Sequence, residues 1–384
     1  MLRNTLEEEG SAEMDGPTAE RNEMKRPEVA LWVTRAVLVV NGEDHTCWNL
    51  RKRALTQLGV ASVHDELAFT RVLLSKHTKS GEAWAHRKWA IQQLLDAGAS
   101  ASVDYMKLCA AEVELCERVA LLYPKNYYCW THRQWAVKTI SPAQNGSDEV
   151  DGGGGIVSVL GELQTMQGYV ARHVGDHAGF HYYEWILMRI VDYFSPPPLN
   201  GGAPLLAHLL AGRTATTLDG EGSVALPPPP PLPQAVLDVW RGAWARSTQL
   251  LDTYGEHETI WQHRRFMAGA LLVLLQWEQG NGAHTGVTSL IDLFVKREPA
   301  DGAGTGLVTA NALAVEELTM ARGRACRTSQ PADKRRLAAA YYLFLIRHAL
   351  PLAKLSAAED HSDEMGAILA DLAPMQARAW AELS

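Results

Sequence analysis

The sequence lacks the patterns that would mark a disulfide framework, a zinc site or a nucleic-acid interface. Its five cysteines show no Cys-x-x-Cys pairing and no cluster with histidine; they stand at positions 47, 109, 116, 129 and 326. We therefore expect no metal site on this chain, and a reducing compartment, the cytoplasm, suits these thiols best. The formal net charge of −8, without a visible stripe of Lys and Arg, argues against nucleic acid as a partner.

Long apolar runs are also missing. The longest, such as residues 268–275, fall far short of the roughly 18 to 20 residues that a membrane span requires. Residues 1–26 are acidic and have no apolar core, so we expect no secretory signal there. Instead of a signal, we expect residues 1–28 to form a disordered acidic tail.

An aromatic anchor recurs along the chain, in which tryptophan outnumbers phenylalanine by 12 to 6. Residues 130–135, Trp-Thr-His-Arg-Gln-Trp, nearly repeat residues 84–89, Trp-Ala-His-Arg-Lys-Trp, and related segments begin at 48, 180 and 261. The anchors are separated by 36, 46, 50 and 81 residues. This range is typical of helical hairpins that stack because none can cover its own apolar faces. The fold class predicted is all-α, a solenoid of helical hairpins.

Helical geometry explains the spacing within each repeat. At about 100° per residue, offsets 0, +3 and +7 from the anchor lie within about 60° of one another. Trp84, Arg87 and Ile91 therefore share one face, whereas His86 and Trp89 point to the other. A helix patterned on two faces is expected to pack against both its own partner helix and the next repeat.

We expect these repeated positions to build the fold rather than to act on a substrate. The aromatic rings should be core, and the buried arginines should bond carbonyls or carboxylates at the loop between helices. The repeat histidines should be packing residues with satisfied hydrogen bonds. The structural anchors are Trp48, Arg51, Trp84, Arg87, Trp130, Arg133, Trp261 and Arg264, and the histidines are His86, His132 and His263.

Residues 29–384 are expected to form a single helical-repeat domain, because stacked repeats share one continuous core. Low-complexity insertions rich in glycine or proline interrupt it near residues 141–155, 195–233 and 279–306. Past residue 297, residues 307–325 and 334–350 read as amphipathic helices without the anchor. These helices are candidates for the cap that hides the last apolar face of a solenoid.

Residues 124–135, Pro-Lys-Asn-Tyr-Tyr-Cys-Trp-Thr-His-Arg-Gln-Trp, with their weaker copies over about residues 40–275, resemble the repeat of protein prenyltransferase alpha subunits. The pattern is most similar to a divergent, repeat-containing member of that family. The resemblance implies a crescent-shaped, right-handed superhelix of hairpins wrapped around a separate beta subunit. In the family, that partner holds the catalytic zinc and most of the isoprenoid pocket.

The chemistry implied by the resemblance is alkylation of a protein cysteine by an isoprenoid diphosphate, with zinc on the partner lowering the pKa of the thiol. In the family, the Lys-Asn-Tyr loop of the alpha subunit lends a lysine to the departing diphosphate. Carried over, Lys125 and Tyr127 are the catalytic candidates, while Asn126 and His177 are candidates for contacting the substrate. No metal ligand is expected on this chain, and geranylgeranyl diphosphate is the expected co-substrate.

A loop just before a helix is a natural anion site, because free backbone amides and the helix dipole point toward it. Lys79 nevertheless stands at the same offset before Trp84 as Lys125 does before Trp130. Position alone therefore does not single out Lys125, whereas the full Lys-Asn-Tyr tripeptide does.

The expected function is that of the alpha subunit of a protein geranylgeranyltransferase similar to the type III enzyme, inactive alone. The implied partner is the Rab geranylgeranyltransferase beta subunit, and the implied substrate is a protein with a C-terminal cysteine motif. Alpha subunits of farnesyl, type I or Rab-type prenyltransferases are the nearest alternatives. A non-catalytic helical-repeat scaffold of tetratricopeptide type is the alternative from another class.

Overall fold

The computed structural model describes residues 26–98, 104–140, 154–194, 234–280, 310–346 and 361–372. In these ranges all regular structure is helical, which confirms the all-α prediction. The chain divides into two compact units, residues 1–149 and 150–384. Each unit is described by itself, and the single domain and the crescent shape stay predictions.

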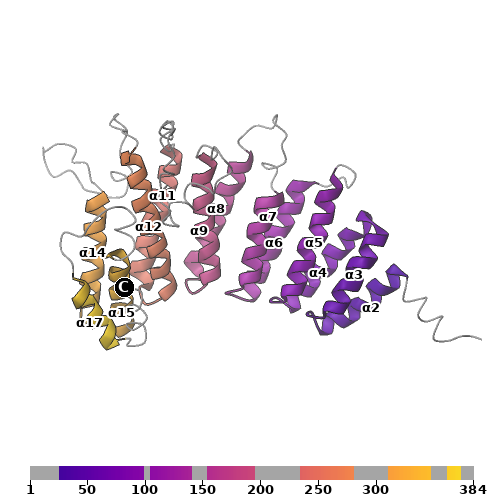
Figure 1. Ribbon diagram of the computed structural model, residues 1–384, viewed down its shortest axis with the longest axis horizontal. Helices are drawn as coiled ribbons and strands as arrows, with labels where there is room; N and C mark the ends of the chain where they lie inside the picture. Colours follow the sequence, from indigo (N-terminus) through magenta and orange to yellow (C-terminus); the bar gives the residue numbers. More distant parts are fainter. Residues whose placement is uncertain are drawn as a thin grey trace, which may run out of the picture. The chain divides into compact units, whose positions relative to one another are not determined.

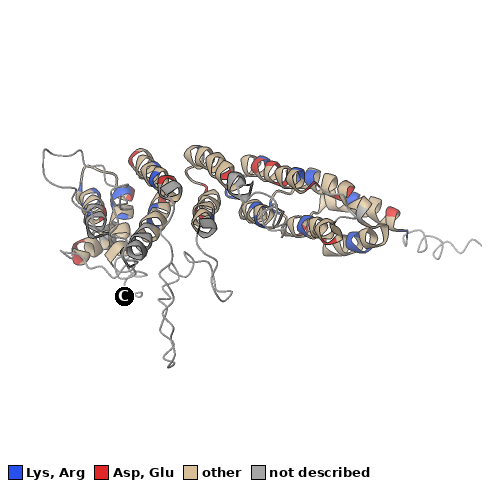
Figure 2. Ribbon diagram, turned by 90° about the horizontal axis from the view of Figure 1, so that it is seen from above, with Lys and Arg blue, Asp and Glu red and all other residues tan. Residues whose placement is uncertain are grey.

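The first unit consists of three helical hairpins arranged in two layers (Figure 1). The first helices of the hairpins, here called the A layer, are α2 (Pro27–Val40), α4 (Val63–Lys76) and α6 (Tyr105–Leu122). The second helices, the B layer, are α3 (His45–Leu58), α5 (Gly81–Ala97) and α7 (Tyr127–Ile140), and a short 3-10 helix, η1 (Val60–Ser62), precedes α4. Helices contact their neighbours within each layer as well as their hairpin partners, and Figure 2 shows the two layers as two rows.

Each B-layer helix starts at a polar residue four positions before the tryptophan anchor. The side chains of Asp44, Ser80 and Asn126 each accept a hydrogen bond from the backbone amide three residues later, at 2.7, 3.1 and 3.3 Å. Such caps satisfy an amide that the helix itself leaves unpaired. The indole Nε1 of Trp84 donates to the carbonyl of Thr78 at 3.0 Å, which ties the anchor to the turn before it.

The tryptophan anchors lie in the core, as predicted. Trp48, Trp84 and Trp130 are only 1%, 4% and 3% exposed. Apolar side chains from α4, α5 and α7 pack into one cluster, made of Val63, Leu67, Ala90, Ile91, Leu94, Ala136 and Ile140. The tryptophans at offset +5, Trp89 and Trp135, pack against this cluster and stay half-buried.

The second unit repeats the hairpin plan (Figure 1). Its helices are α8 (Gly154–Arg172), α9 (His177–Phe194), α11 (Gln234–Tyr254), α12 (Glu258–Gly280), α14 (Ala310–Cys326), α15 (Ala332–Phe344) and α17 (Ser362–Leu372). The anchors Phe180 and Trp261 are buried. Helices α14 and α15 confirm the two helices expected near the C-terminal end. Helix α17 packs against α15, so α15 is not the last helix of this unit.

Several expectations fall largely outside the described residues. These are the acidic tail over residues 1–28 and the insertions near 141–155, 195–233 and 279–306. At their described edges the chain is helical, because α2 begins at Pro27, α8 begins at Gly154 and α12 ends at Gly280. In the described part of the chain, no helix combines the length and the hydropathy needed to cross a bilayer.

Candidate functional site

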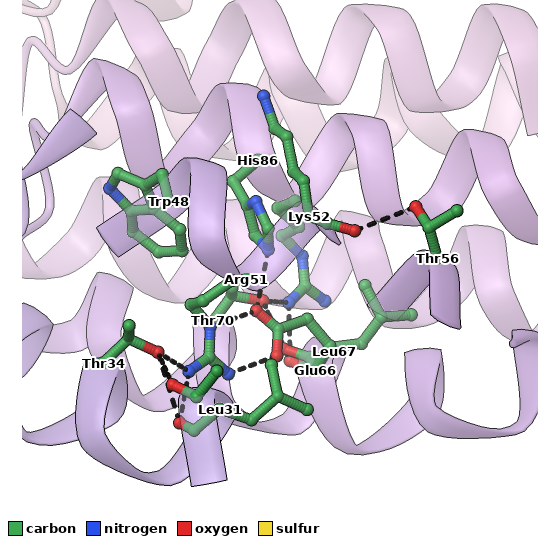
Figure 3. A network of polar contacts seen from close by, with 12 residues as sticks. Leu31, Thr34, Trp48, Arg51, Lys52, Thr56, Glu66, Leu67, Thr70 and His86 are labelled. Atoms are coloured by element: carbon green, nitrogen blue, oxygen red, sulfur yellow. Dashed lines mark hydrogen bonds and ion pairs between the residues drawn. The ribbon is translucent and has the colours of Figure 1, made fainter. Parts of the chain in front are cut away.

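A buried network of Arg, Glu and His links each hairpin of the first unit to the next (Figure 3). Arg51 on α3 donates from Nε to Oε1 of Glu66 on α4 at 2.8 Å and pairs through Nη2 with Oε2. His86 on α5 lies 2.7 Å from the same Glu66 through Nε2. One carboxylate therefore joins three helices of two hairpins.

The next hairpin repeats this network with the same residue types. Arg87 on α5 forms two bonds to the carboxylate of Glu112 on α6, at 2.7 and 2.6 Å. His132 on α7 lies 2.9 Å from the same carboxylate. All three side chains are buried. Arg51 and Arg87 each meet a glutamate of the following hairpin, so the two networks tie successive hairpins of the first unit together.

The remaining guanidinium donors also find acceptors. Nη1 of Arg51 donates to the carbonyl of Leu31 at 2.7 Å and to Oγ1 of Thr34 at 2.9 Å, and Arg87 does the same with Leu67 and Thr70. Bonding to carbonyls and carboxylates was predicted, but its expected place, the loop between helices, was wrong. The anchor arginine points across the layers, so its acceptors lie on helices of the A layer.

The electrostatics of these networks favour a structural role. Burial raises the pKa of Glu66, but hydrogen bonds from His86 and Arg51 outweigh it and lower that pKa to about 2. Glu112 likewise has a pKa lowered to about 2, because Arg87 and His132 outweigh its burial. For His86, in contrast, burial lowers the pKa. At neutral pH a neutral imidazole therefore donates from Nε2 to the charged carboxylate of Glu66. Side chains this buried cannot reach a substrate.

Sequence reasoning missed the glutamates, although a fixed spacing marks them. Each lies 20 residues before its partner at offset +2 from an anchor: Glu66 before His86, Glu112 before His132, and Glu162 before Tyr182. Searching for acidic residues at a constant distance from the anchors would have found them.

On α9 and α15 of the second unit, a tyrosine bonds the buried glutamate where the first unit has a histidine. Tyr182 on α9 donates to Glu162 at 2.6 Å, and Tyr341 on α15 donates to Glu317 on α14 at 2.6 Å. Glu317 also receives Arg264 of α12, through bonds of 3.0 and 2.5 Å. The Arg–Glu link between successive hairpins thus recurs in both units.

One junction of the second unit lacks this ion pair altogether. Tyr183 stands at the arginine position of α9. On α4, the paired Glu66 stands four residues before Thr70, the threonine that accepts from Arg87. On α11, the corresponding position, four residues before Thr248, is occupied by Trp244. Both charges are therefore replaced together, which avoids the cost of a buried charge without a partner. His263 is buried and lies 3.0 Å from Oε1 of Glu184, as expected of a packing histidine with a satisfied hydrogen bond.

The Lys-Asn-Tyr tripeptide forms the turn between α6 and α7. Lys125 is exposed and has φ +61°; among the described residues no other non-glycine residue has a positive φ. Such a conformation is uncommon for a residue with a Cβ atom. Asn126 is fully buried, caps α7 and donates from Nδ2 to the carbonyl of Thr78 at 2.7 Å. Both polar atoms of Asn126 thus serve the fold, and its contact with a substrate stays a prediction.

Tyr127, the first residue of α7, is 64% exposed and lies beside Lys125 in the chain. Its ring centroid is 6.2 Å from that of Tyr128. Lys79 differs from Lys125 in two respects, because its φ is not positive and its Nζ lies 4.1 Å from the ring centroid of Tyr123. The structure therefore presents Lys125 and Tyr127 together to solvent at the start of a helix.

His177 lies in the second unit, where it is the first residue of α9 and exposed. Its Nδ1 is 3.1 Å from Oε1 of Gln262, and its Nε2 is 3.1 Å from Oγ1 of Thr259. The start of α9 therefore contacts the start of α12. Lys125 and His177 belong to different units, so their expected approach to one substrate stays a prediction.

The residues that the structure describes hold no group of three or more His, Cys, Asp and Glu side chains arranged to bind a metal ion. The zinc expected on a partner subunit stays a prediction.

Two hairpins of the first unit match a known repeat. Residues 63–94 and 109–140, which include most of α4–α5 and α6–α7, match the model of the protein prenyltransferase alpha subunit repeat. The matched segments carry the Arg87–Glu112–His132 network, Glu66 and His86.

Comparison with curated proteins gives relatives of the same kind. The chain is 27% identical over 286 residues to protein prenyltransferase alpha subunit repeat-containing protein 1 of Danio rerio, covering 70% of this chain and 61% of the relative. It is 30% identical over 273 residues to repeat-containing protein 1-A of Xenopus laevis, covering 67% and 58%.

A weaker match links the chain to a named enzyme subunit. It is 25% identical over 184 residues to geranylgeranyl transferase type-2 subunit alpha of Bos taurus, covering 45% of this chain and 27% of the relative. The matched part of the chain spans about 60% of the length of the repeat-containing relatives. The hairpins, their buried networks and these matches identify the chain as a carrier of protein prenyltransferase alpha subunit repeats and a relative of repeat-containing protein 1.

Proposed function

We propose that the chain is the alpha subunit of a heterodimeric protein prenyltransferase. The observation that carries the proposal is the turn between α6 and α7, where exposed Lys125 adopts a positive φ. Backbone strain persists only where the surrounding structure or the function requires it. Here it sets a lysine and the exposed Tyr127 beside the N-terminal end of α7, where a helix favours negative charge.

In the proposed reaction, the sulfur of a substrate thiolate bonds to C1 of the isoprenoid, and the bond from C1 to the diphosphate oxygen breaks. Diphosphate leaves with the electron pair of that bond. The ammonium of Lys125 and the hydroxyl of Tyr127 stabilise the negative charge that develops on the leaving oxygens. Zinc on the beta subunit would hold the thiolate.

The finer assignment follows the similarity to geranylgeranyl transferase type-2 subunit alpha. We assign geranylgeranyl diphosphate as co-substrate, the Rab geranylgeranyltransferase beta subunit as partner and a cytoplasmic protein with a C-terminal cysteine motif as acceptor. The alpha subunit of a farnesyl or type I prenyltransferase is the nearest alternative, and the beta subunit that the chain binds would distinguish them.

A non-catalytic scaffold is the second candidate, because the buried networks would stabilise stacked hairpins equally well without catalysis. The strained turn is the feature that favours the enzyme subunit, since a scaffold has no need of a lysine in that conformation.

Assembly is the direct test of the proposal. The purified chain is mixed with the Rab geranylgeranyltransferase beta subunit or with the beta subunit of farnesyltransferase, and the molar mass of each mixture is measured by light scattering after gel filtration. We expect a stable 1:1 complex with the Rab beta subunit. A complex with the other beta subunit alone would change the isoprenoid assignment, and the absence of any complex would favour the scaffold.

A further inference from the structure

The B layer of the first unit carries cations that have no carboxylate partner among the described residues. We call these residues the cationic face: Lys52 and Arg53 on α3, Lys88 on α5 and Lys138 on α7. Lys52 is half-buried and the other three are exposed. Within the described residues none of the four forms an ion pair with a carboxylate.

The acidic residues of the same layer are already engaged at the helix ends. Glu82, near the start of α5, lies 3.4 Å from Nδ1 of His45, and Asp96, near its end, accepts a hydrogen bond from Gln92 at 2.8 Å. The middle of the layer is therefore positive, in a chain whose formal net charge is −8. Local charge of the opposite sign to the whole protein is a feature of binding surfaces.

The A layer does not share this imbalance. Its exposed charges include both signs, and several pair with one another. Arg71 on α4 lies 2.7 Å from Glu114 on α6, and Lys107 lies 3.1 Å from Asp104. The A and B layers of the first unit thus differ in the balance of their charges. Figure 2 shows where the charged residues lie along the two rows of helices.

Half-buried tryptophans stand between the cations. Nζ of Lys52 lies 5.9 Å from the ring centroid of Trp89 on the next B-layer helix, and Nζ of Lys88 lies 5.1 Å from that of Trp135. A cation over an indole face is attracted by the negative charge of the ring face. Lys52 and Lys88 are therefore each held near an indole ring. The cationic face thus combines positioned cations with apolar surface.

We infer that the cationic face docks an acidic segment of a partner protein, which in the enzyme proposed above is the beta subunit, so this assignment rests on the proposed function. Carboxylates of the segment meet the four free cations, and its apolar side chains cover Trp89 and Trp135. Tryptophan in a partly desolvated setting is characteristic of the residues that dominate protein interfaces. Nucleic acid fits less well, because phosphate binding draws on a denser array of Lys and Arg.

Charge reversal on one layer, with matched reversal on the other, tests the inference. Lys52→Glu combined with Lys88→Glu changes the cationic face, and Lys107→Glu combined with Arg118→Glu is the A-layer control. We expect the first pair to weaken binding of the Rab geranylgeranyltransferase beta subunit about tenfold or more and to flatten its salt dependence. The control pair should change affinity less than about twofold. Equal affinities for both pairs would overturn the inference, provided that thermal melting shows both variants folded.

A synthetic acidic peptide separates this inference from the proposed function. A short peptide of alternating Glu and Leu is titrated into the full-length wild type and the cationic-face variant, with indole fluorescence as the signal. Binding to the wild type that the variant loses supports the inference even if no beta subunit binds. No binding of either probe overturns it.

Two further outcomes would assign the face to another occupant. A single-stranded RNA homopolymer that binds the wild type more tightly than the acidic peptide, and fails to bind the variant, would make the face a nucleic-acid surface. Carbodiimide cross-links in the isolated chain between Lys88 and the carboxylates of residues 1–25 would make it an internal contact. Either result would overturn docking of an acidic partner.

Discussion

At the scale of single residues, the turn before α7 shows what a sequence can and cannot convey. The tripeptide at 125–127 stands out in the sequence and singles out Lys125 from Lys79. The positive φ of Lys125 does not, because it depends on how the turn meets the rest of the hairpin, which a tripeptide does not specify. The sequence predicted the residue, and the structure supplied the strain.

That strain gives a stability prediction. Lys125→Gly should leave the free energy of unfolding unchanged or raise it by up to roughly 1.5 kcal/mol. Glycine removes the steric penalty of about 1 to 2 kcal/mol that a residue with a Cβ atom has in the left-handed region, which stabilises the fold. It also raises the entropy of the unfolded chain, which costs about 0.5 to 1 kcal/mol of stability. Urea denaturation measures the difference. Lys79→Gly is the control and should lose stability, since φ at Lys79 is not positive. Equal losses in both variants would show that Lys125 is not strained.

The buried histidines predict how stability depends on pH. Burial lowers the pKa of His86 and of His132 below the ordinary value of 6.5, so the unfolded chain binds protons first as the pH falls. Stability should therefore decline below about pH 6.5. A second decline should begin near pH 4.5, because the pKa of Glu66 is lowered to about 2 in the folded state.

Urea unfolding at a series of pH values checks this prediction. His86→Gln keeps a hydrogen-bond donor but cannot titrate, so it should flatten the slope between pH 6.5 and 5. His45→Gln, which alters a histidine whose side chain is 75% exposed, is the matched control. His132 still titrates in His86→Gln, so we expect a smaller slope rather than none. A slope equal to that of the wild type would place the titrating groups elsewhere.

At the scale of helices, the periodicity of the anchors predicted which faces are buried and that helices pair. It did not by itself show the partners of the arginines, because Glu66 and Glu112 lie on A-layer helices without the aromatic anchor. Their constant distance of 20 residues from the repeat histidines is the one signal that could have found them. Nor did the periodicity predict the junction at α9 and α11, where Tyr183 and Trp244 replace the ion pair. Long-range pairing depends on how hairpins stack, which the spacing of one motif does not determine.

The anchors themselves predict a large loss of stability. Trp130→Ala should destabilise the fold by roughly 3 to 5 kcal/mol, the usual cost of emptying an aromatic core site. Trp130 is 3% exposed, whereas Trp32 on α2 is 72% exposed and serves as the control. Trp32→Ala should change stability by less than about 0.5 kcal/mol. If both variants melt at the temperature of the wild type, the repeat aromatics are not the core.

At the scale of the whole molecule, the chain consists of two units built on the same hairpin plan, and its function is proposed to depend on a second protein. The fold class and the family resemblance could be predicted from the anchors. The partner surface could not, because Lys52, Lys88 and Lys138 read as ordinary solvated lysines until the B layer brings them onto one face with Trp89 and Trp135.

The central claim, that Lys125 takes part in prenyl transfer, is tested most directly by single-turnover kinetics. The assembled complex of each variant with the beta subunit transfers geranylgeranyl to a protein ending in a cysteine motif. Lys125→Gly should slow this step about 10- to 1000-fold while complex formation stays intact, and Lys79→Gly should stay near the wild-type rate. Equal rates for Lys125→Gly and wild type would contradict the account and remove Lys125 from the active site.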